Sequence, residues 1–256
     1  MASASLIFHA LPSIPEIAPG TDLASIAEHA LLAARIEVRA GDVLVFAQKV
    51  VSKAEGRLVR LRDVQPSSRA LELAARCLKD PRLVELVLAE SSEVVRVAPN
   101  VLVTRHRCGY VMANAGIDHS NTGTAPDAGV VLLLPIDADA SARALCSALR
   151  ARLGIAPGVI VSDSFGRPCR MGTVNVALGV DGLPSIVDMR GGCDRDGRRL
   201  QVTQVAIADA IAAGAGLAMG EAAEGAPIVH VRGFASTEPC SDGQALIRPA
   251  KEDLFR

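Results

Sequence analysis

Three polar segments of the chain, residues 116–121, 161–168 and 219–225, carry carboxylates beside glycines or small hydroxyl side chains. Their acids are Asp118, Asp163 and Glu221, and each segment adjoins an apolar stretch. A carboxylate at the end of a buried strand is costly to dehydrate unless a positive group meets it. Carboxylate and hydroxyl oxygens suit Mg²⁺ or Mn²⁺ bound together with substrate phosphates. The three acids therefore indicate a site for metal and phosphate chemistry.

Each of these residues also has an ordinary structural interpretation. Asp163 could cap a turn and pair with Arg167, and for any one turn aspartate taken alone that interpretation is favoured. Lys53 follows an apolar run, where it could serve as a point charge for phosphate or could be a surface lysine paired with Glu55. Three acids in three glycine-bearing segments together favour a site.

Familiar nucleotide and hydrolase motifs are absent from the sequence. It contains no G-x-x-x-x-G-K-[ST], no G-x-G-x-x-G after a strand, no H-E-x-x-H and no G-x-S-x-G. The five histidines show no metal-ligand spacing, and we interpret His119, beside Asp118, as a bystander. Three arginines, Arg167, Arg170 and Arg190, could clamp an anionic substrate or could pack turns against Asp188, Asp194 or Asp196.

Apolar periodicity predicts the elements that hold these segments. Helices are expected at 22–35, 67–78, 81–90, 141–153 and 203–219, the first capped by Thr21. Strands are expected at 43–47, 94–97, 101–105, 110–113, 130–135, 159–162, 174–180, 186–189 and 228–232. The first of these is expected to continue through 50–52 to a polar loop at 53–57, and residues 116–129 are expected to form a loop. Asp163 should stand directly after its strand.

The order of these elements predicts the fold class. Strands and helices mix without a clean alternation, which favours an α+β or irregular mixed α/β architecture over a strict doubly wound sheet. No internal repeat and no long linker divides the chain. We therefore expect one domain over residues 1–256, built as a single body or as two closely packed lobes.

Composition limits the class of protein. The 256 residues carry 27 basic and 28 acidic side chains for a net charge of −1, and 50% are hydrophobic. A near-neutral chain without tryptophan, with one tyrosine and five phenylalanines, offers no basic or base-stacking surface, so no nucleic-acid or membrane partner is expected. A small-molecule enzyme is the expected class.

The cysteines and the start of the chain indicate the compartment. The six cysteines are dispersed without a C-x-x-C pair, which favours reduced and mostly buried thiols over zinc sites or disulfides. The first twenty residues lack a basic segment followed by a long apolar one, and no stretch approaches a membrane span. We expect a cytoplasmic protein.

Taken in order along the chain, the polar segments resemble one enzyme family. The pattern begins with G-D-V-L-V at 41–45, S-K-A-E-G at 52–56 and G-I-D-x-S-N at 116–121. It continues with D-S-F-G-R-P at 163–168, D-x-R-G at 188–191, M-G at 219–220 and E-G-x-P at 224–227. This order resembles the coenzyme F(420)-0:γ-glutamyl ligase family over about residues 13–232.

The resemblance implies a ligase fold that is neither a P-loop nor a Rossmann fold. It implies GTP as co-substrate, two divalent cations (Mg²⁺ or Mn²⁺) with K⁺ as an optional third ion, and a homodimer. Coenzyme F(420)-0 and L-glutamate would be the other substrates. Some family members carry a fused C-terminal flavin-type domain, and we expect the stand-alone form because the sequence ends before one.

The resemblance also assigns roles to residues. Asp118 and Asp163 would bind the first metal, Ser164 and Glu221 the second, and Asp118, Asp163 and Lys53 would be the catalytic residues. Contacts to GTP would come from Ser13, Ile14, Pro15, Glu16, Gln48, Lys49, Lys53, Asn121 and the loop of Met219, Gly220, Glu221, Ala222, Ala223, Glu224, Gly225 and Ala226.

Four residues depart from the commoner family pattern. Ser164 replaces a frequent threonine and keeps the hydroxyl, and Glu221 stands where glutamine is familiar. Cys169 and Met189 replace aromatics expected beside the substrate cleft. These two changes leave open a ligase of the same mechanism for another acid and amine. A non-catalytic GTP- or deazaflavin-binding protein and a purely structural α+β protein are the remaining alternatives.

Overall fold

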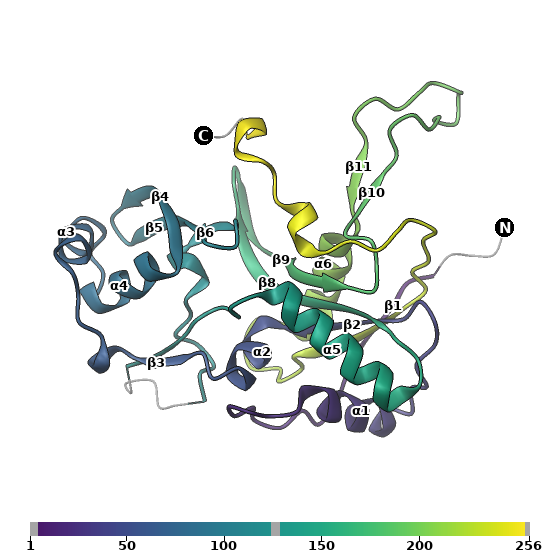
Figure 1. Cartoon of the computed structure of the whole chain (residues 1–256), viewed down its shortest axis with the longest axis horizontal. Helices are drawn as coiled ribbons and strands as arrows, with labels where there is room; N and C mark the ends of the chain where they lie inside the picture. The colour runs from purple at the N-terminus through teal and green to yellow at the C-terminus, as the bar shows by residue number, and fades with distance from the viewer. Residues whose placement is uncertain (1–4, 124–128, 254–256) are drawn as a thin grey trace.

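A five-stranded mixed sheet forms the centre of the molecule (Figure 1). The structure is a computed structural model that describes residues 5–123 and 129–253. Across the sheet the strands run in the order β1 (Ile7–Ala10), β12 (Ile228–Arg232), β2 (Val43–Ala47), β8 (Gly158–Arg167) and β9 (Arg170–Asp181). Strands β2 and β8 are parallel, and the other neighbours are antiparallel.

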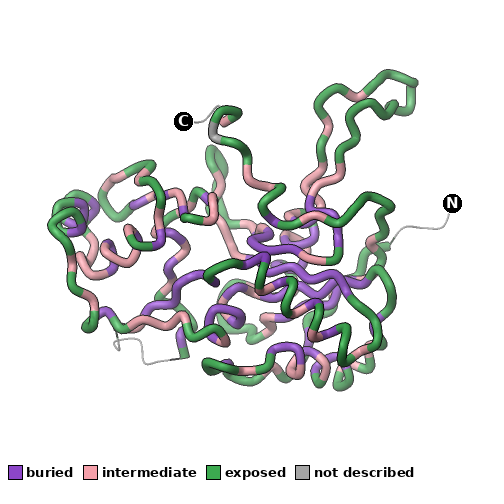
Figure 2. Tube along the Cα trace, in the orientation of Figure 1, coloured by how far each residue is buried: buried purple, intermediate pink, exposed green. Residues whose placement is uncertain are grey.

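Helices cover both faces of this sheet, which explains why its central strands are apolar throughout. Leu44 and Phe46 of β2 pack on one face with α1 (Leu23–Ala33) and α5 (Ala138–Leu153). Val43 and Val45 pack on the other face with α6 (Ile207–Met219). Successive strand residues point to opposite faces, so two covered faces require an uninterrupted apolar run. The buried trace through the sheet follows this layering (Figure 2).

A second group of elements has an apolar core of its own and lies to one side of the sheet (Figure 1). It contains α3 (Ser68–Cys77), α4 (Pro81–Ala89), the three-stranded sheet of β4 (Ser91–Ala98), β5 (Val101–His106) and β6 (Val111–Ala113), and the pair β3 (Leu58–Arg60) with β7 (Val130–Leu132). Short 3₁₀ turns lie at Leu61–Asp63, Asn114–Gly116, Gly243–Leu246 and Ala250–Glu252.

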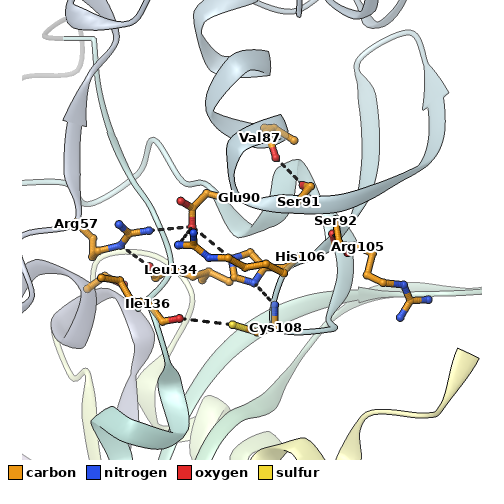
Figure 3. Close-up of polar contacts among 12 residues, drawn as sticks. Arg57, Val87, Glu90, Ser91, Ser92, Arg105, His106, Cys108, Leu134 and Ile136 are labelled. Atoms are coloured by element: carbon orange, nitrogen blue, oxygen red, sulfur yellow. Dashed lines mark hydrogen bonds and ion pairs between the residues drawn. The ribbon is translucent and has the colours of Figure 1, made fainter. Parts of the chain in front are cut away.

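A buried ionic network around Glu90 joins the second group of elements to the segment that follows α2 (Figure 3). Glu90, directly after α4, accepts hydrogen bonds of 2.8 Å from both Arg57 and Arg107. Arg57 follows α2 (Gln48–Ala54) and also donates through Nε to the Leu134 carbonyl at 2.9 Å. His106 Nε2 lies 3.5 Å from the same Glu90 oxygen. One carboxylate therefore ties α4, β5 and the end of α2 together.

An arm formed by β10 (Ile186–Asp188) and β11 (Gln204–Ala206) projects away from the body of the molecule (Figure 1). It carries Arg190, whose guanidinium donates to Asp188 within the same turn. Arg167 donates to the Met171 carbonyl at the tip of the β8–β9 hairpin. For these two arginines the structure supports turn packing over a substrate clamp.

The α+β class is confirmed, and most of the expected elements are present with shifted ends. Residues 50–52 do not extend β2, because the chain turns into α2 at Gln48 and buries Val50 and Val51 in the core beneath α1. A short apolar run fits a buried strand and a buried helix equally, so periodicity alone could not separate them.

Three of the shifted element boundaries have an identifiable physical cause. Helix α1 is capped by Asp22, which accepts from the Ser25 N–H at 3.0 Å, and not by Thr21. Strand β8 does not end before Asp163 but continues to Arg167, because β9 begins early enough to pair with it. Helix α6 starts at Ile207, since the preceding residues pair with β10.

The cysteines are free thiols, as expected, but fewer are buried than predicted. Cys77 and Cys146 are buried and Cys108 is half-buried, whereas Cys169, Cys193 and Cys240 are exposed. Among the described residues, no helix has both the length and the apolar character needed to cross a bilayer.

Candidate functional site

A cleft of about 740 Å³ lies on the side of the central sheet toward which the parallel strands β2 and β8 run. Its walls come from residues 14–17, the end of β2 with α2, residues 119–123, the middle of β8, and the loop between α6 and β12. Ligands of open α/β sheets bind outside the carboxyl ends of parallel strands, where loops diverge. The strand order thus brings together segments that are up to two hundred residues apart.

Helix α2 presents two lysines to this cleft, four residues apart and hence on one helix face. Lys49 forms an ion pair of 2.6 Å with Asp118 and donates to Ser120 Oγ at 2.7 Å. The Ser120 N–H in turn donates to Asp118 at 2.7 Å. These bonds attach the 118–120 segment to α2.

Lys53 is buried, with 6% of its surface exposed, and it forms its ion pair with Glu16. It is therefore not the surface lysine paired with Glu55 that the sequence allowed. A side chain at Gly123 would collide with the Glu16 carboxylate, so the 119–123 loop packs closely over this pair. Two sequence-distant loops meet at one buried ammonium group.

Asp163 lies within β8 and lines the cleft. Burial and the negative charges of Asp118 and Glu221 together raise its pKa to about 7, although the hydrogen bond from the Ser164 N–H and the charge of Lys49 oppose this. Asp118 has a lowered pKa: burial opposes the charge, but the bonds from Lys49 and Ser120 outweigh it. Asp118 and Glu221 thus both lie near enough to Asp163 to influence it electrostatically.

The loop after α6 forms the far wall of the cleft. Gly220 ends the helix with φ of +74°, a conformation that favours glycine. Glu224 accepts from the Ala222 N–H at 2.8 Å and thereby folds the loop on itself. Asn121 Nδ2 donates to the Ala222 carbonyl at 3.3 Å, which connects this loop with the 119–123 segment.

Most of the predicted site residues line this single cleft. They are Ile14, Pro15, Glu16, Gln48, Lys49, Lys53, Asn121, Asp163, Ser164 and residues 219–226. Ser13 and Asp118 are not among the lining residues, although Asp118 contacts the lining side chains Lys49 and Ser120. Cys169 and Met189, expected beside the cleft, do not line it, because they belong to the β8–β9 tip and to the arm.

Several cleft residues were not predicted from the sequence. His119, interpreted there as a bystander, lines the cleft, as do Ser120, Ser162 and Asn175. Asn175 is the one amide side chain within the otherwise apolar run 174–178 of β9. A polar residue in a buried strand was the available signal for it.

Comparison with known proteins follows the same span of the chain. The model of the family described as F420-0:Gamma-glutamyl ligase matches residues 12–233. The chain belongs to this ligase family. The matched span agrees to within a residue at each end with the resemblance over about residues 13–232, so the prediction of a ligase is confirmed at the level of the family.

Relatives of known name resemble the chain over nearly their whole length. The coenzyme F420:L-glutamate ligase of Methanothermobacter thermautotrophicus is 44% identical over 245 residues, covering 95% of this chain and 96% of the relative. That of Methanopyrus kandleri is 45% identical over 250 residues, 96% of each. That of Halobacterium salinarum is 46% identical over 256 residues, 96% of this chain and 94% of the relative.

The metals implied by the F420-0:Gamma-glutamyl ligase resemblance can be tested against the donor groups of the cleft. Within residues 5–123 and 129–253, no three His, Cys, Asp or Glu side chains converge ready to hold a metal ion. However, the cleft contains a half-buried carboxylate at Asp163, and the buried atoms Ser162 Oγ and Asn175 Oδ1 have no hydrogen-bond partner among the residues that the structure describes. Carboxylate, hydroxyl and amide oxygens fit a divalent cation that also takes ligands from phosphates. The oxygen atoms of the cleft are therefore suitable ligands for the divalent cations that the family resemblance implies.

Proposed function

We propose that this protein is a GTP-dependent ligase that joins L-glutamate to coenzyme F420-0 and releases GDP and phosphate. The observation that supports it most directly is the common cleft, which gathers two lysines, Asp163 and the glycine-bearing loop 219–226. The names of the relatives, which are coenzyme F420:L-glutamate ligases over at least 94% of their length, support the substrate pair.

The chemistry requires an activated carboxyl group, because oxide cannot leave a free carboxylate. In the first step an oxygen of the acceptor carboxylate bonds to the γ-phosphorus of GTP, and the bond to the bridging oxygen breaks to release GDP. In the second step the amine of glutamate attacks the acyl carbon of that acyl phosphate. Phosphate leaves with the bonding electrons, and the amine loses a proton.

Residues of the cleft suit both steps because each step concentrates negative charge. Lys49 and Lys53 supply ammonium groups from one face of α2. Residues 219–226 form the opposite wall, and hydrogen bonds of Glu224 and Asn121 fix the backbone of this loop. Divalent cations, when bound, neutralise phosphate charge, and Asp118, Asp163, Ser164 and Glu221 are the residues that would hold them. No nucleophilic side chain is needed.

The decisive experiment replaces one carboxylate by its amide. Asp163→Asn is expected to abolish glutamate-dependent phosphate release from GTP with coenzyme F420-0 and Mn²⁺, while circular dichroism and thermal unfolding show a folded protein. Asp63→Asn, an exposed acid in the Leu61–Asp63 turn, is the control and keeps wild-type turnover. Undiminished turnover in Asp163→Asn would refute the site assignment.

Mass spectrometry of the product separates the proposal from its rivals. A mass increase of the acceptor by one or more glutamyl units supports it, and a conjugate formed only with another acid or amine would favour a different ligase. Binding of GDP and Mn²⁺ without any phosphate release would favour a non-catalytic binding protein. The homodimer and the cytoplasmic location stay predictions, and light scattering on the purified protein tests the first.

A further inference from the structure

One face of the β8–β9 hairpin brings three neutral oxygen-bearing side chains to the floor of the cleft. Ser164 pairs directly with Asn175 across the two strands, and Ser162 stands two residues before Ser164 on the same face. This face looks toward α6, since Asn175 lies against Gly216 of that helix. Ser162 is 1% exposed and Asn175 is 8% exposed.

Two of these side chains lack a protein partner for their oxygen. Among the described residues, neither Ser162 Oγ nor Asn175 Oδ1 has a hydrogen-bond partner. The Asn175 amide nitrogen donates to the sulfur of Met219 at the long distance of 4.0 Å. A buried polar group left unpaired loses its hydration without compensation, so native proteins retain few of them. Both unpaired oxygens line the cleft that holds Asp163.

Helix α6 has a gap in its side-chain surface at the point that faces Asn175. A Cβ at Gly216 would come within 2.7 Å of Asn175 Cγ and 2.8 Å of its Oδ1. The helix is rich in alanine, and a glycine in a helix interior is destabilising relative to alanine. The chain accepts this cost, and the space it leaves is filled by the amide of Asn175.

Neutral oxygens of this kind are ordinary ligands of hard cations. Mg²⁺ and Mn²⁺ take six oxygens from carboxylates, hydroxyls, amides, waters and phosphates. The acids of the cleft do not form a cage by themselves, because within the described part of the chain no three metal-binding side chains converge. A cation at Ser164 and Glu221 therefore needs further oxygens, and Ser162 on the same face of β8 and Asn175 opposite Ser164 on β9 offer them.

We infer that Asn175 Oδ1 and Ser162 Oγ are two further oxygen ligands of the second cation, the one that Ser164 and Glu221 would hold. This inference rests on the metal dependence in the proposed function but not on the identity of the acceptor or amine. It explains why the two buried oxygens have no protein partner. It also explains why the helix has a glycine at position 216, where a side chain would collide with Asn175. It also predicts that both side chains are more useful to the metal-bound protein than to the metal-free one.

Two variants test the inference without any turnover. Asn175→Leu and Ser162→Ala remove the oxygen, and Thr104→Val is the matched control, because Thr104 Oγ1 is also buried and unpaired but lies in β5 outside the cleft. Mn²⁺ affinity is measured without nucleotide by electron paramagnetic resonance of free Mn²⁺. Thermal unfolding of the metal-free proteins is measured in parallel.

We expect Mn²⁺ affinity to fall at least tenfold in Asn175→Leu and Ser162→Ala, and to stay within twofold of wild type in Thr104→Val. The melting temperature of the metal-free variants should be unchanged or higher, since an unpaired polar group has been removed. Unchanged Mn²⁺ affinity in Ser162→Ala and in Asn175→Leu would overturn the inference. If Asn175→Leu does not fold, Ser162→Ala alone decides in the same way.

Other outcomes separate this inference from the proposed function. A wild-type protein that binds Mn²⁺ through Asn175 but releases no phosphate would refute the ligase activity and support the cation ligands. A variant that loses affinity for GDP in the absence of metal, with Mn²⁺ affinity intact, would overturn the inference and indicate a direct phosphate contact. Lower stability of the metal-free variants with intact Mn²⁺ binding would overturn it in favour of a structural role.

Discussion

Lys49 Nζ lies 2.6 Å from Asp118 Oδ2, so a lysine of α2 holds the acid that the family resemblance assigns to the first metal. The same ammonium group donates to Ser120 Oγ at 2.7 Å. The side chains of Lys49 and Asp118 are each exposed by about one-third or less. Any cation that binds Asp118 must share that carboxylate with Lys49 or displace it. In the proposed function, this relationship would involve α2 in metal binding as well as in phosphate binding.

Replacing Lys49 by methionine should therefore change cation and nucleotide binding in opposite directions. A partly exposed ion pair is worth about 1 kcal/mol, so Mn²⁺ should bind Lys49→Met about fivefold more tightly without nucleotide. GTP should bind more weakly, because a positive charge has left the cleft. Calorimetric titration measures both, with Lys79→Met outside the cleft as control. Unchanged or weaker Mn²⁺ binding would show that Lys49 does not compete for Asp118.

Glu221→Gln should retain ligase activity with weaker metal binding. Glu221 is exposed at the cleft wall, where a carboxylate and an amide oxygen can both ligate a cation, but the amide lacks the negative charge. The Mn²⁺ concentration for half-maximal phosphate release should rise severalfold while the maximal rate stays within about threefold. Glu238→Gln, exposed and outside the cleft, is the control. Complete loss of activity would mean that Glu221 does more than bind metal.

Acid should destabilise the protein through Asp42, which directly precedes the central strand β2. Burial opposes ionisation there, but hydrogen bonds from Arg232 and His230 outweigh it and lower the pKa of Asp42 to about 2. An unfolded aspartate has a pKa of about 3.9, so the stabilisation is complete above pH 4 and is lost as the pH falls toward 2. The ionised Asp42 therefore contributes about 2 kcal/mol to the free energy of unfolding.

Urea unfolding of the wild type and Asp42→Asn as a function of pH measures this contribution. The two proteins should differ in free energy of unfolding by about 2 kcal/mol or more at pH 6, and the gap should narrow between pH 4 and pH 2. A gap that stays constant across this range would show that Asp42 does not titrate with the lowered pKa.

The Glu90 network should couple the two apolar cores. Removing one member of a buried ion pair leaves the other charge uncompensated, at a cost of about 3 kcal/mol, so Arg57→Met and Glu90→Gln should each destabilise the protein strongly. The double variant should lose about 1–3 kcal/mol less than the sum of the two. Chemical unfolding gives all three values, and strict additivity would show that the pair at 2.8 Å contributes no coupling.

Local sequence patterns were sufficient for much of the scaffold. The apolar run at 43–47 indicated a strand buried on both faces, and Asp80-Pro81 marked the start of α4 where Asp80 caps the helix. The ordered motifs at 116–121 and 163–168 indicated the family. These signals are local because strand alternation, helix caps and motif spacing depend on residues only a few positions apart.

Tertiary structure alone decided which of these segments share a cleft. Pairing of β2 with β8 places α2 beside Asp163, and pairing of β9 with β8 places Asn175 opposite Ser164. Neither pairing can be deduced from residues near these positions, because long-range strand order is set by packing of both sheet faces. For the same reason Lys53 forms its ion pair with the sequence-distant Glu16 and not with its neighbour Glu55. The sequence determined the chemical groups and the family, and the fold determined which groups meet.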